Sequence, residues 1–489
     1  MRSLLRIFSA LMVAVMLFCL SACGKGNSEA RIYVALPEMP ETLDPQVAKS
    51  DSELLIARNI YEGLTRKNEN GDTVLAAAKE YNYSDKTYTF ILRDGLRWES
   101  GEDVTAADFV FGLKRALLPE TQAPFARLLY SIKGAKAVNT GAASPDTLGV
   151  SAVDSKTLKI ELESEESEFL SILSYPVAMP CNQSFFSNSA GRYGLEKEFV
   201  LSNGSYKLAK WNKTDNGIRL YKNENYNGDF KPQNGGIFIS KDKEKTVAEK
   251  LTSGESDIAL LPTEYLSAVS GKNIKTVSVE NICWVLSLGG EFTPGIRQAL
   301  CMSVRPEIYA KELPQGMRAA DSFFPGCLGV NAPEGGFNVA YDSVTPQTLI
   351  NSELKNYKNK KLPQTTLIYS RNESIKPAII SIVGDWQNSL GTFINIKPAD
   401  KSLESEITDH SLSVCIFPIT ADSTLKEYLM RIGAGSGGDI ASAFGRAVSA
   451  YNLLPIAFED TTVGYLDNIS GVYMSAAGGY IDFSFVVKK

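Results

Sequence analysis

Hydrophobic residues follow two different spacings along this chain, and each spacing predicts a different kind of element. Apolar residues that alternate with polar ones, or that form short runs, predict strands over 31–36, 88–92, 158–162, 217–221 and 258–261. Apolar residues three and four positions apart predict helices over 52–64 and 246–251, and a further helix opens at Thr105. The two kinds of segment interleave, so the sequence predicts a mixed α/β fold.

The chain is long enough for several structural units. It has 489 residues, of which 44% are hydrophobic and 22% are charged, which is the composition of an ordinary globular protein. At about 150 residues per domain, this length predicts about three units. The formal net charge is −6 and no long basic run occurs, which argues against a nucleic-acid partner because phosphate binding needs a basic face.

The N-terminal residues have the features of a bacterial lipoprotein signal peptide. Two arginines precede the apolar stretch Leu11 to Leu20, which is too short for a stable membrane span. Leu20-Ser21-Ala22-Cys23 then resembles a lipobox, the motif in which cleavage occurs before an acylated cysteine. We expect residues 1–22 to be removed, Cys23 to carry lipid and residues 23–30 to form a tether, on the extracytoplasmic side of the membrane. The alternative is an ordinary signal peptide with a chance cysteine.

Loss of this segment takes the formal charge from −6 to −8, because it contains two arginines and no acid. The remaining chain has no other apolar run long enough to cross a bilayer. Lipid on Cys23 is therefore the membrane attachment that the sequence predicts.

His410 is the single histidine of the chain, which restricts the catalytic and metal sites that could be built on histidine. A catalytic Ser/His/Asp or Cys/His set, or a zinc site built on histidines, would have to use it. The glycines of 433–438 formally match GxGxxG, but they follow a segment with helical spacing, whereas a phosphate cradle follows a strand. We predict no enzyme activity, no cofactor and no metal site.

The cysteines give no catalytic or metal motif either. Once the signal peptide and the lipidated position are set aside, an odd number remains, so at most two disulfides can form. No CxxC spacing occurs, which favours buried apolar thiols. The remaining cysteines are Cys181, Cys283, Cys301, Cys327 and Cys415.

The segment from Tyr88 to Val110 resembles the signature of a known family. It reads YTFILRDGLRW from Tyr88 and VTAADFV from Val104, and it is similar to family 5 of the extracytoplasmic solute-binding proteins, the oligopeptide- and dipeptide-binding components of ABC importers. Further motifs follow in family order, so the resemblance covers essentially the whole mature chain. They are Thr42-Leu43-Asp44-Pro45, Tyr61-Glu62-Gly63-Leu64, SNGSYKL at 202–208, GESDIA at 254–259, IRQAL at 296–300, Trp386 with Leu390-Gly391, Pro455 and Asp482-Phe483.

The resemblance implies an α/β, two-lobed fold of the type II periplasmic-binding-protein class, in its large peptide-binding variant with an extra subdomain. Two chain crossings join the lobes, near 279–288 and 453–458, which suits rigid-body closure on a ligand. By analogy, lobe one comprises 31–50, 174–281 and 455–489, its inserted subdomain 51–173, and lobe two 282–454.

The resemblance also implies a ligand site between the lobes. Family members hold the main chain of an extended peptide by strand-like hydrogen bonds, and an acid in lobe two pairs with the peptide's α-ammonium group. Asp422 is the best match for that acid, although it could instead cap a helix. The residues from Glu38 to Glu41 would form the opposite wall. The other predicted contacts are Met39, Phe125, Leu260, Leu261, Trp284 and Ile419, and Met39, Phe125 and Trp284 could equally belong to the core.

Three departures from the family pattern leave the ligand open. Ile419 stands where the family usually has Trp, Leu260 and Leu261 replace polar or aromatic groups, and the stretch from Asp422 to Pro455 is shortened. We expect a monomer that delivers a peptide or another small solute to ABC permease subunits. The alternatives are a binding protein for a non-peptide solute, such as a metal chelate, an opine-like molecule or a saccharide, and a degenerate homologue that acts as a receptor or scaffold.

Overall fold

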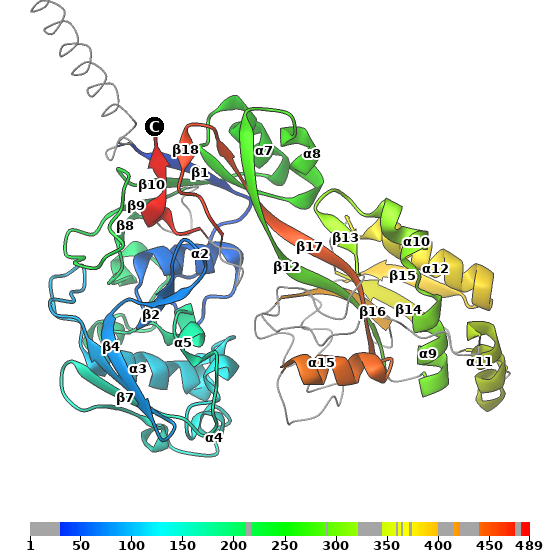
Figure 1. Ribbon diagram of the computed structural model, residues 1–489, viewed down its shortest axis with the longest axis horizontal. Helices are drawn as coiled ribbons and strands as arrows, with labels where there is room; N and C mark the ends of the chain where they lie inside the picture. Colours follow the sequence, from blue (N-terminus) through cyan, green and yellow to red (C-terminus); the bar gives the residue numbers. More distant parts are fainter. Residues whose placement is uncertain are drawn as a thin grey trace, which may run out of the picture.

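One twisted sheet runs through the molecule and joins two lobes (Figure 1). The computed structural model describes residues 30–211, 217–289, 292–320, 345–357, 360–362, 365–370, 374–399, 414–420, 440–474 and 481–489. Within these residues the sheet has eleven strands, in the order β15-β14-β16-β12-β17-β11-β1-β10-β9-β8, with β13 paired to β17 beside this path.

The strands of this sheet fall into three groups. Lobe one contributes β1 (Ile32–Leu36), β8 (Tyr206–Lys210), β9 (Gly217–Lys222), β10 (Ile237–Lys241) and β11 (Ile258–Leu261). Lobe two contributes β13 (Met317–Ala319), β14 (Thr365–Tyr369), β15 (Ile394–Pro398) and β16 (Val414–Thr420). The long strands β12 (Ile274–Leu288) and β17 (Leu453–Leu466) pass through both lobes, as Figure 1 shows.

Helices cover the sheet and form the cores. In lobe one, α7 (Glu244–Ser253) and α8 (Leu266–Val269) pack on the sheet, and α2 (Asp51–Ile60) belongs to the main lobe-one core. The lobe-two core contains residues of α9 (Pro294–Ser303), α11 (Pro346–Glu353) and α12 (Lys376–Leu390). The helices α10 (Pro306–Tyr309) and α15 (Ile440–Ser449) complete the described part of lobe two.

A second sheet forms the inserted subdomain. Its order is β4-β5-β7-β6, from β4 (Ala78–Ser84), β5 (Thr87–Leu92), β6 (Val150–Ala152) and β7 (Thr157–Glu161). The helix α3 (Ala106–Leu117) contacts β6 and β7. The shorter elements are β2 (Thr65–Lys67), β3 (Thr73–Leu75), α4 (Ala135–Asn139), α5 (Phe169–Ile172), α6 (Gln183–Asn188), β18 (Ile469–Ser470) and β19 (Val487–Lys488).

The predicted strands and helices are confirmed within a residue or two, with one exception. The helix predicted over 52–64 ends at Ile60. Another segment of the chain occupies the backbone carbonyl that the next helical turn would use as a hydrogen-bond acceptor. The backbone N–H of Gly204 donates to the carbonyl of Ile60 at 2.8 Å. Asn203 then pairs with the backbone of Glu62, accepting from its N–H at 3.0 Å and donating to its carbonyl at 2.9 Å.

Candidate functional site between the lobes

The ends of three strands converge on the boundary between the lobes. The strands β1 and β11 are parallel, and β11 pairs antiparallel with β17, so their carboxyl ends point toward lobe two. The strand β16 is antiparallel to β12, with Thr420 opposite Ile282, so its carboxyl end points toward lobe one. Ligands of open α/β sheets bind beyond the carboxyl ends of strands. The sheet register therefore indicates a site between the lobes.

The loop that follows β1 contains the residues predicted to form the lobe-one wall of this site. Glu53, in the first turn of α2 and 2% exposed, fixes this loop with one carboxylate. Its Oε1 accepts from the backbone N–H groups of Glu41 and Thr42 at 3.1 and 3.2 Å, and its Oε2 accepts from those of Lys49 and Ser50 at 2.8 and 3.0 Å. A loop held at four amides is preorganised for contact with a ligand.

This wall carries exposed negative charge. Glu38 is exposed and accepts a hydrogen bond of 3.5 Å from the hydroxyl of Ser52. Desolvation raises the pKa of Glu38, and the nearby carboxylate of Asp51 raises it further. Pro40 lacks an N–H group, so main-chain pairing with a ligand is interrupted at that residue.

The crossing strands carry a buried carboxyl group that contacts both lobes. Glu459 on β17 is 7% exposed. It accepts from the hydroxyl of Thr263, at the end of lobe-one strand β11, at 2.5 Å and from the indole Nε1 of Trp284 at 2.6 Å. Burial raises the pKa of Glu459, while the two hydrogen bonds act in the opposite direction. This side chain therefore links the lobes at their covalent crossing.

A β-bulge lies beside this link. The register between β12 and β17 shifts between Glu280 and Ile282, which leaves Asn281 as the extra residue. The side chain of Asn281 accepts from the backbone N–H and the hydroxyl of Thr461 at 3.2 and 2.8 Å. A bulge bends and twists a strand locally, so the two crossing strands change direction at the lobe boundary.

The structure places the predicted ligand contacts in different surroundings. Met39 and Leu260 are partly buried against the main core of lobe one. Phe125 and Leu261 are 5% and 4% exposed in the cores of lobe one. Trp284 is 1% exposed in the core of lobe two. Core packing accounts for the three buried side chains, and their contact with a ligand stays a prediction.

The remaining predicted residues are described in part or lie outside the described residues. Ile419 pairs through its backbone with Cys283 near the end of β16. Asp422 follows that strand by two residues in the sequence and lies outside the described residues, as do Cys23, His410 and the glycines of 433–438. Of the cysteines, Cys181, Cys283, Cys301 and Cys415 are buried and form no disulfide among the described residues, and Cys327 lies outside the described part.

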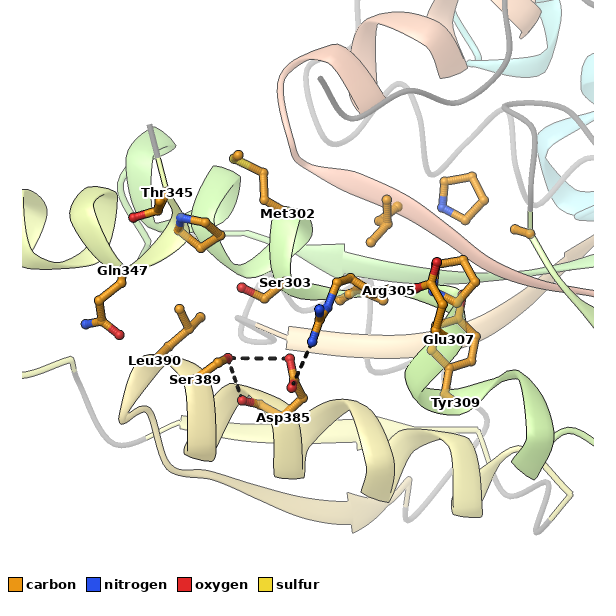
Figure 2. Close-up of a pocket in the computed structure, with 16 residues that line it drawn as sticks. Met302, Ser303, Arg305, Glu307, Tyr309, Thr345, Gln347, Asp385, Ser389 and Leu390 are labelled. Carbon is orange, nitrogen blue, oxygen red and sulfur yellow. Dashed lines mark hydrogen bonds and ion pairs between the residues drawn. The ribbon is translucent and has the colours of Figure 1, made fainter. Parts of the chain in front are cut away.

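A cavity lies mainly within lobe two, away from the loop that follows β1. It has a volume of about 860 Å³ and lies between α9, α10, α11 and α12 (Figure 2). Arg305 and Asp385 form an ion pair of 3.6 Å across it, and the hydroxyl of Ser389 donates to the Asp385 carbonyl at 2.6 Å. Its lining residues lie between Met302 and Pro455, and all but Pro455 fall within the range predicted for lobe two.

The described part of the chain holds no group of three or more His, Cys, Asp or Glu side chains arranged to bind a metal. Within the same residues, no helix combines the length and the hydrophobicity needed to cross a membrane.

The family of the chain follows from a match over most of its length. The model of the bacterial extracellular solute-binding proteins, family 5 Middle, matches residues 72–439. The chain belongs to this family. Its members bind substrates outside the cytoplasm and are not enzymes.

Curated relatives and a solved structure agree with this assignment. The oligopeptide-binding protein OppA of Bacillus subtilis is 30% identical over 77% of this chain and 74% of its own length. The dipeptide-binding protein DppE of the same organism is 28% identical over 76% of this chain and 71% of its own. OppA of Burkholderia pseudomallei superposes with a TM-score of 0.77 over 95% of this chain and all of its own, at 19% identity. The solute-binding protein therefore has the two-lobed type II fold.

Two sets of contacts near the candidate site of this solute-binding protein escaped sequence reasoning. The partners of Glu459 lie 175 and 196 residues away, so only the folded sheet brings them together. Glu53 was detectable in part, because Ser50 followed three residues later by an acid is a capping-box signal. Its second role, fixing the amides of Glu41 and Thr42, has no local signal.

Proposed function

We propose that this solute-binding protein captures a peptide between its lobes and delivers it to the permease of an ABC importer. The observation that carries the proposal is the convergence of β1, β11 and β16 on one interlobe site in a chain of this family. The names of its relatives, an oligopeptide-binding and a dipeptide-binding protein, support a peptide as the ligand. Lipid on Cys23 holds the monomeric chain at the extracytoplasmic face of the membrane.

In this proposal the two lobes divide the recognition of the peptide. Backbone groups beyond β1 and β16 pair with the peptide main chain, as in strand addition. The carboxylate of Asp422 receives the peptide's α-ammonium group, because a charge-assisted hydrogen bond is strong enough to fix the register of a main-chain ligand. The bulge at Asn281 and the link at Glu459 lie where closure of the lobes must bend the chain.

Mass spectrometry of the chain that lacks residues 1–23 tests ligand capture directly. Native and denaturing spectra of protein purified from bacteria are compared, and the released molecules are fragmented. A set of peptide masses supports the proposal. One discrete non-peptide mass would instead indicate a different solute. No released ligand, together with no thermal shift against a mixed peptide pool, would favour the scaffold alternative.

Asp422→Asn tests the named contact. Loss of the charge should weaken binding of the captured peptide by about tenfold or more, because one partner of a desolvated charge pair is removed. Asp146→Asn is the matched control, since the Asp146 side chain is 88% exposed on the inserted subdomain. If the Asp422 variant and the parent bind the captured peptide with equal affinity, Asp422 does not contact the ligand.

A further inference from the structure

The outer face of the lobe-one sheet carries a cluster of aromatic rings and cations. The ring of Phe238 on β10 lies 5.5 Å from that of Tyr33 and 6.1 Å from that of Tyr221. Arg31 and Arg219 lie over the same ring, at 5.2 and 5.3 Å from its centroid. These five residues come from the neighbouring strands β1, β10 and β9 and from the residue before β1. We call them the outer cluster.

Among the described residues, no helix covers this end of the sheet face. Ala35 lies two residues beyond Tyr33 on the same face of β1, and it is buried in the small core that includes residues of α7. At the other end of the strand, Tyr33 is 42% exposed, Tyr221 is 36% exposed and both arginines are exposed. The exposed surface thus combines large aromatic side chains with positive charge.

The two arginines contribute net positive charge to this face. Neither Arg31 nor Arg219 has a carboxylate partner among the described residues, and each contacts the face of Phe238. Lys488 adds a cation at 5.8 Å from the Tyr33 ring, although it also pairs with buried Asp257 at 2.8 Å.

The tether enters the fold at this cluster. The carbonyl of Ala30 accepts from the backbone N–H of Gly235 at 2.7 Å, and the N–H of Ile32 donates to the carbonyl of Gly236 at 3.0 Å. Arg31 follows the proposed lipid-bearing Cys23 by eight residues. A fully extended chain of that length spans about 30 Å at most, so a lipid on Cys23 keeps the outer cluster near the bilayer.

We propose that the outer cluster docks onto the anionic phospholipid surface to which the chain is tethered. This inference rests on the lipid anchor in the proposed function. Tyrosine rings are favoured at the membrane–water interface, and arginines next to an anionic bilayer are attracted to its headgroups. The mature chain carries a formal charge of −8, so an anionic membrane repels the protein as a whole. A face that is locally positive is then the face that turns toward the lipid.

Docking orients lobe one relative to the membrane. The sheet that holds β1 and β11 would lie with its outer face on the lipid, and the interlobe site would open to one side. The tether supplies a high local concentration, so a contact that is weak by itself becomes populated.

A site-specific fluorescence measurement tests the proposal. The chain that begins at Cys23, with Cys327→Ser, is coupled through Cys23 to a maleimide phospholipid in vesicles of phosphatidylglycerol and phosphatidylcholine that include a brominated lipid. The four described cysteines are buried, so Cys23 is the reactive thiol. Tyr33→Trp places a reporter in the outer cluster, and the native Trp98, Trp211, Trp284 and Trp386 are buried away from the quencher. Tyr83→Trp is the matched control, because Tyr83 is 41% exposed on the inserted subdomain.

The proposal requires that the brominated lipid quench the tryptophan at position 33 and leave the one at position 83 unchanged. Arg31→Gln with Arg219→Gln should lower the ratio of docked to undocked protein by about thirtyfold, since each basic residue near an anionic surface contributes about fivefold. Lys86→Gln with Lys136→Gln makes the same charge change on the inserted subdomain and should have no effect. Vesicles of phosphatidylcholine alone, or high salt, should abolish the quenching.

Equal quenching at positions 33 and 83, or quenching unaffected by loss of the two arginines, would overturn the inference. Failure of the proposed function gives a different result. If Cys23 is not acylated in protein from its native membrane fraction, the proposed lipid anchor is wrong. If the interlobe site binds no peptide, the proposed ligand is wrong. The chain coupled chemically to vesicles tests the outer cluster independently of both results.

Discussion

The indole Nε1 of Trp284 donates a 2.6 Å hydrogen bond to the carboxyl group of Glu459, and both side chains are buried where the lobes join. The same carboxyl group accepts from Thr263 of lobe one. No cation pairs with Glu459 among the described residues, and burial raises its pKa above the ordinary value of 4.5. A buried acid of this kind is held by hydrogen bonds rather than by an opposite charge.

Glu459→Gln should change how stability depends on pH. The pKa of Glu459 is higher in the folded protein than in the unfolded chain, where it is near 4.5. Its contribution to the free energy of unfolding is therefore fully present below the unfolded-state pKa and is lost as pH rises through the folded-state pKa. The Gln variant lacks this loss, so its free energy of unfolding should improve relative to the parent as pH rises above 4.5. Urea unfolding of both proteins over a pH series measures the difference. A difference that stays constant across the series would contradict the prediction.

Arg115 and Lys114 are neighbours in α3, but their substitution should cost very different amounts of stability. Arg115 forms a bidentate pair with Asp44, and the two side chains are 8% and 5% exposed. Arg115→Met should cost about 3–5 kcal/mol, because it leaves a buried carboxylate without its partner. Lys114→Met breaks a pair with Asp146, whose side chain is 88% exposed, and should cost about 1 kcal/mol or less. The midpoints of urea unfolding measure both changes in free energy, provided that the dependence of that free energy on urea concentration is unchanged. Similar losses of stability in the two variants would contradict the prediction.

Two glycines should respond to alanine with opposite signs. A Cβ at Gly204 would lie 2.8 Å from the backbone carbon of Ile60 and 2.9 Å from its oxygen, so backbone must move. Gly204→Ala should therefore destabilise the protein by about 1–3 kcal/mol. Gly384 lies in α12, where a Cβ would meet no other atom within 4 Å, and Gly384→Ala should stabilise by about 0.5–1 kcal/mol through helix propensity. Thermal unfolding of the two variants beside the parent checks the signs.

The motifs that identify the family from sequence are mostly residues that hold the fold. Asn203 and Gly204 fix the end of α2, and Asp44 pairs with Arg115. Asp257 accepts from the backbone N–H of Tyr33 at 2.9 Å and ties β11 to β1. These contacts join segments that are far apart in the sequence, so the motifs indicate the fold through the family resemblance. The strands and helices were predicted separately, from the spacing of hydrophobic residues.

The ligand site was less accessible to the same reasoning. Phe125, Leu261 and Trp284 are predicted contacts that lie in cores, and apolarity alone does not distinguish a pocket from a core. The contacts of Glu459 with Thr263 and Trp284 depend on a sheet that joins distant segments, which no local pattern reveals. The family resemblance predicts a site between the lobes, and the strand directions bring the ends of β1, β11 and β16 to that boundary.

The described cysteines should be inert in the folded protein. Cys181, Cys283, Cys301 and Cys415 are buried thiols outside any disulfide of the described residues, and burial raises the pKa of Cys181, Cys301 and Cys415 to about 12. The thiolate is the reactive form, so a thiol-specific reagent at pH 8 should modify none of the four without denaturant. The chain lacking residues 1–23 with Cys327→Ser should therefore release almost no chromophore from a disulfide reagent when native, and the signal of four thiols in urea. Rapid reaction of even one thiol in the native protein would show that its surroundings open to solvent, and mass spectrometry of the labelled peptides would identify which one.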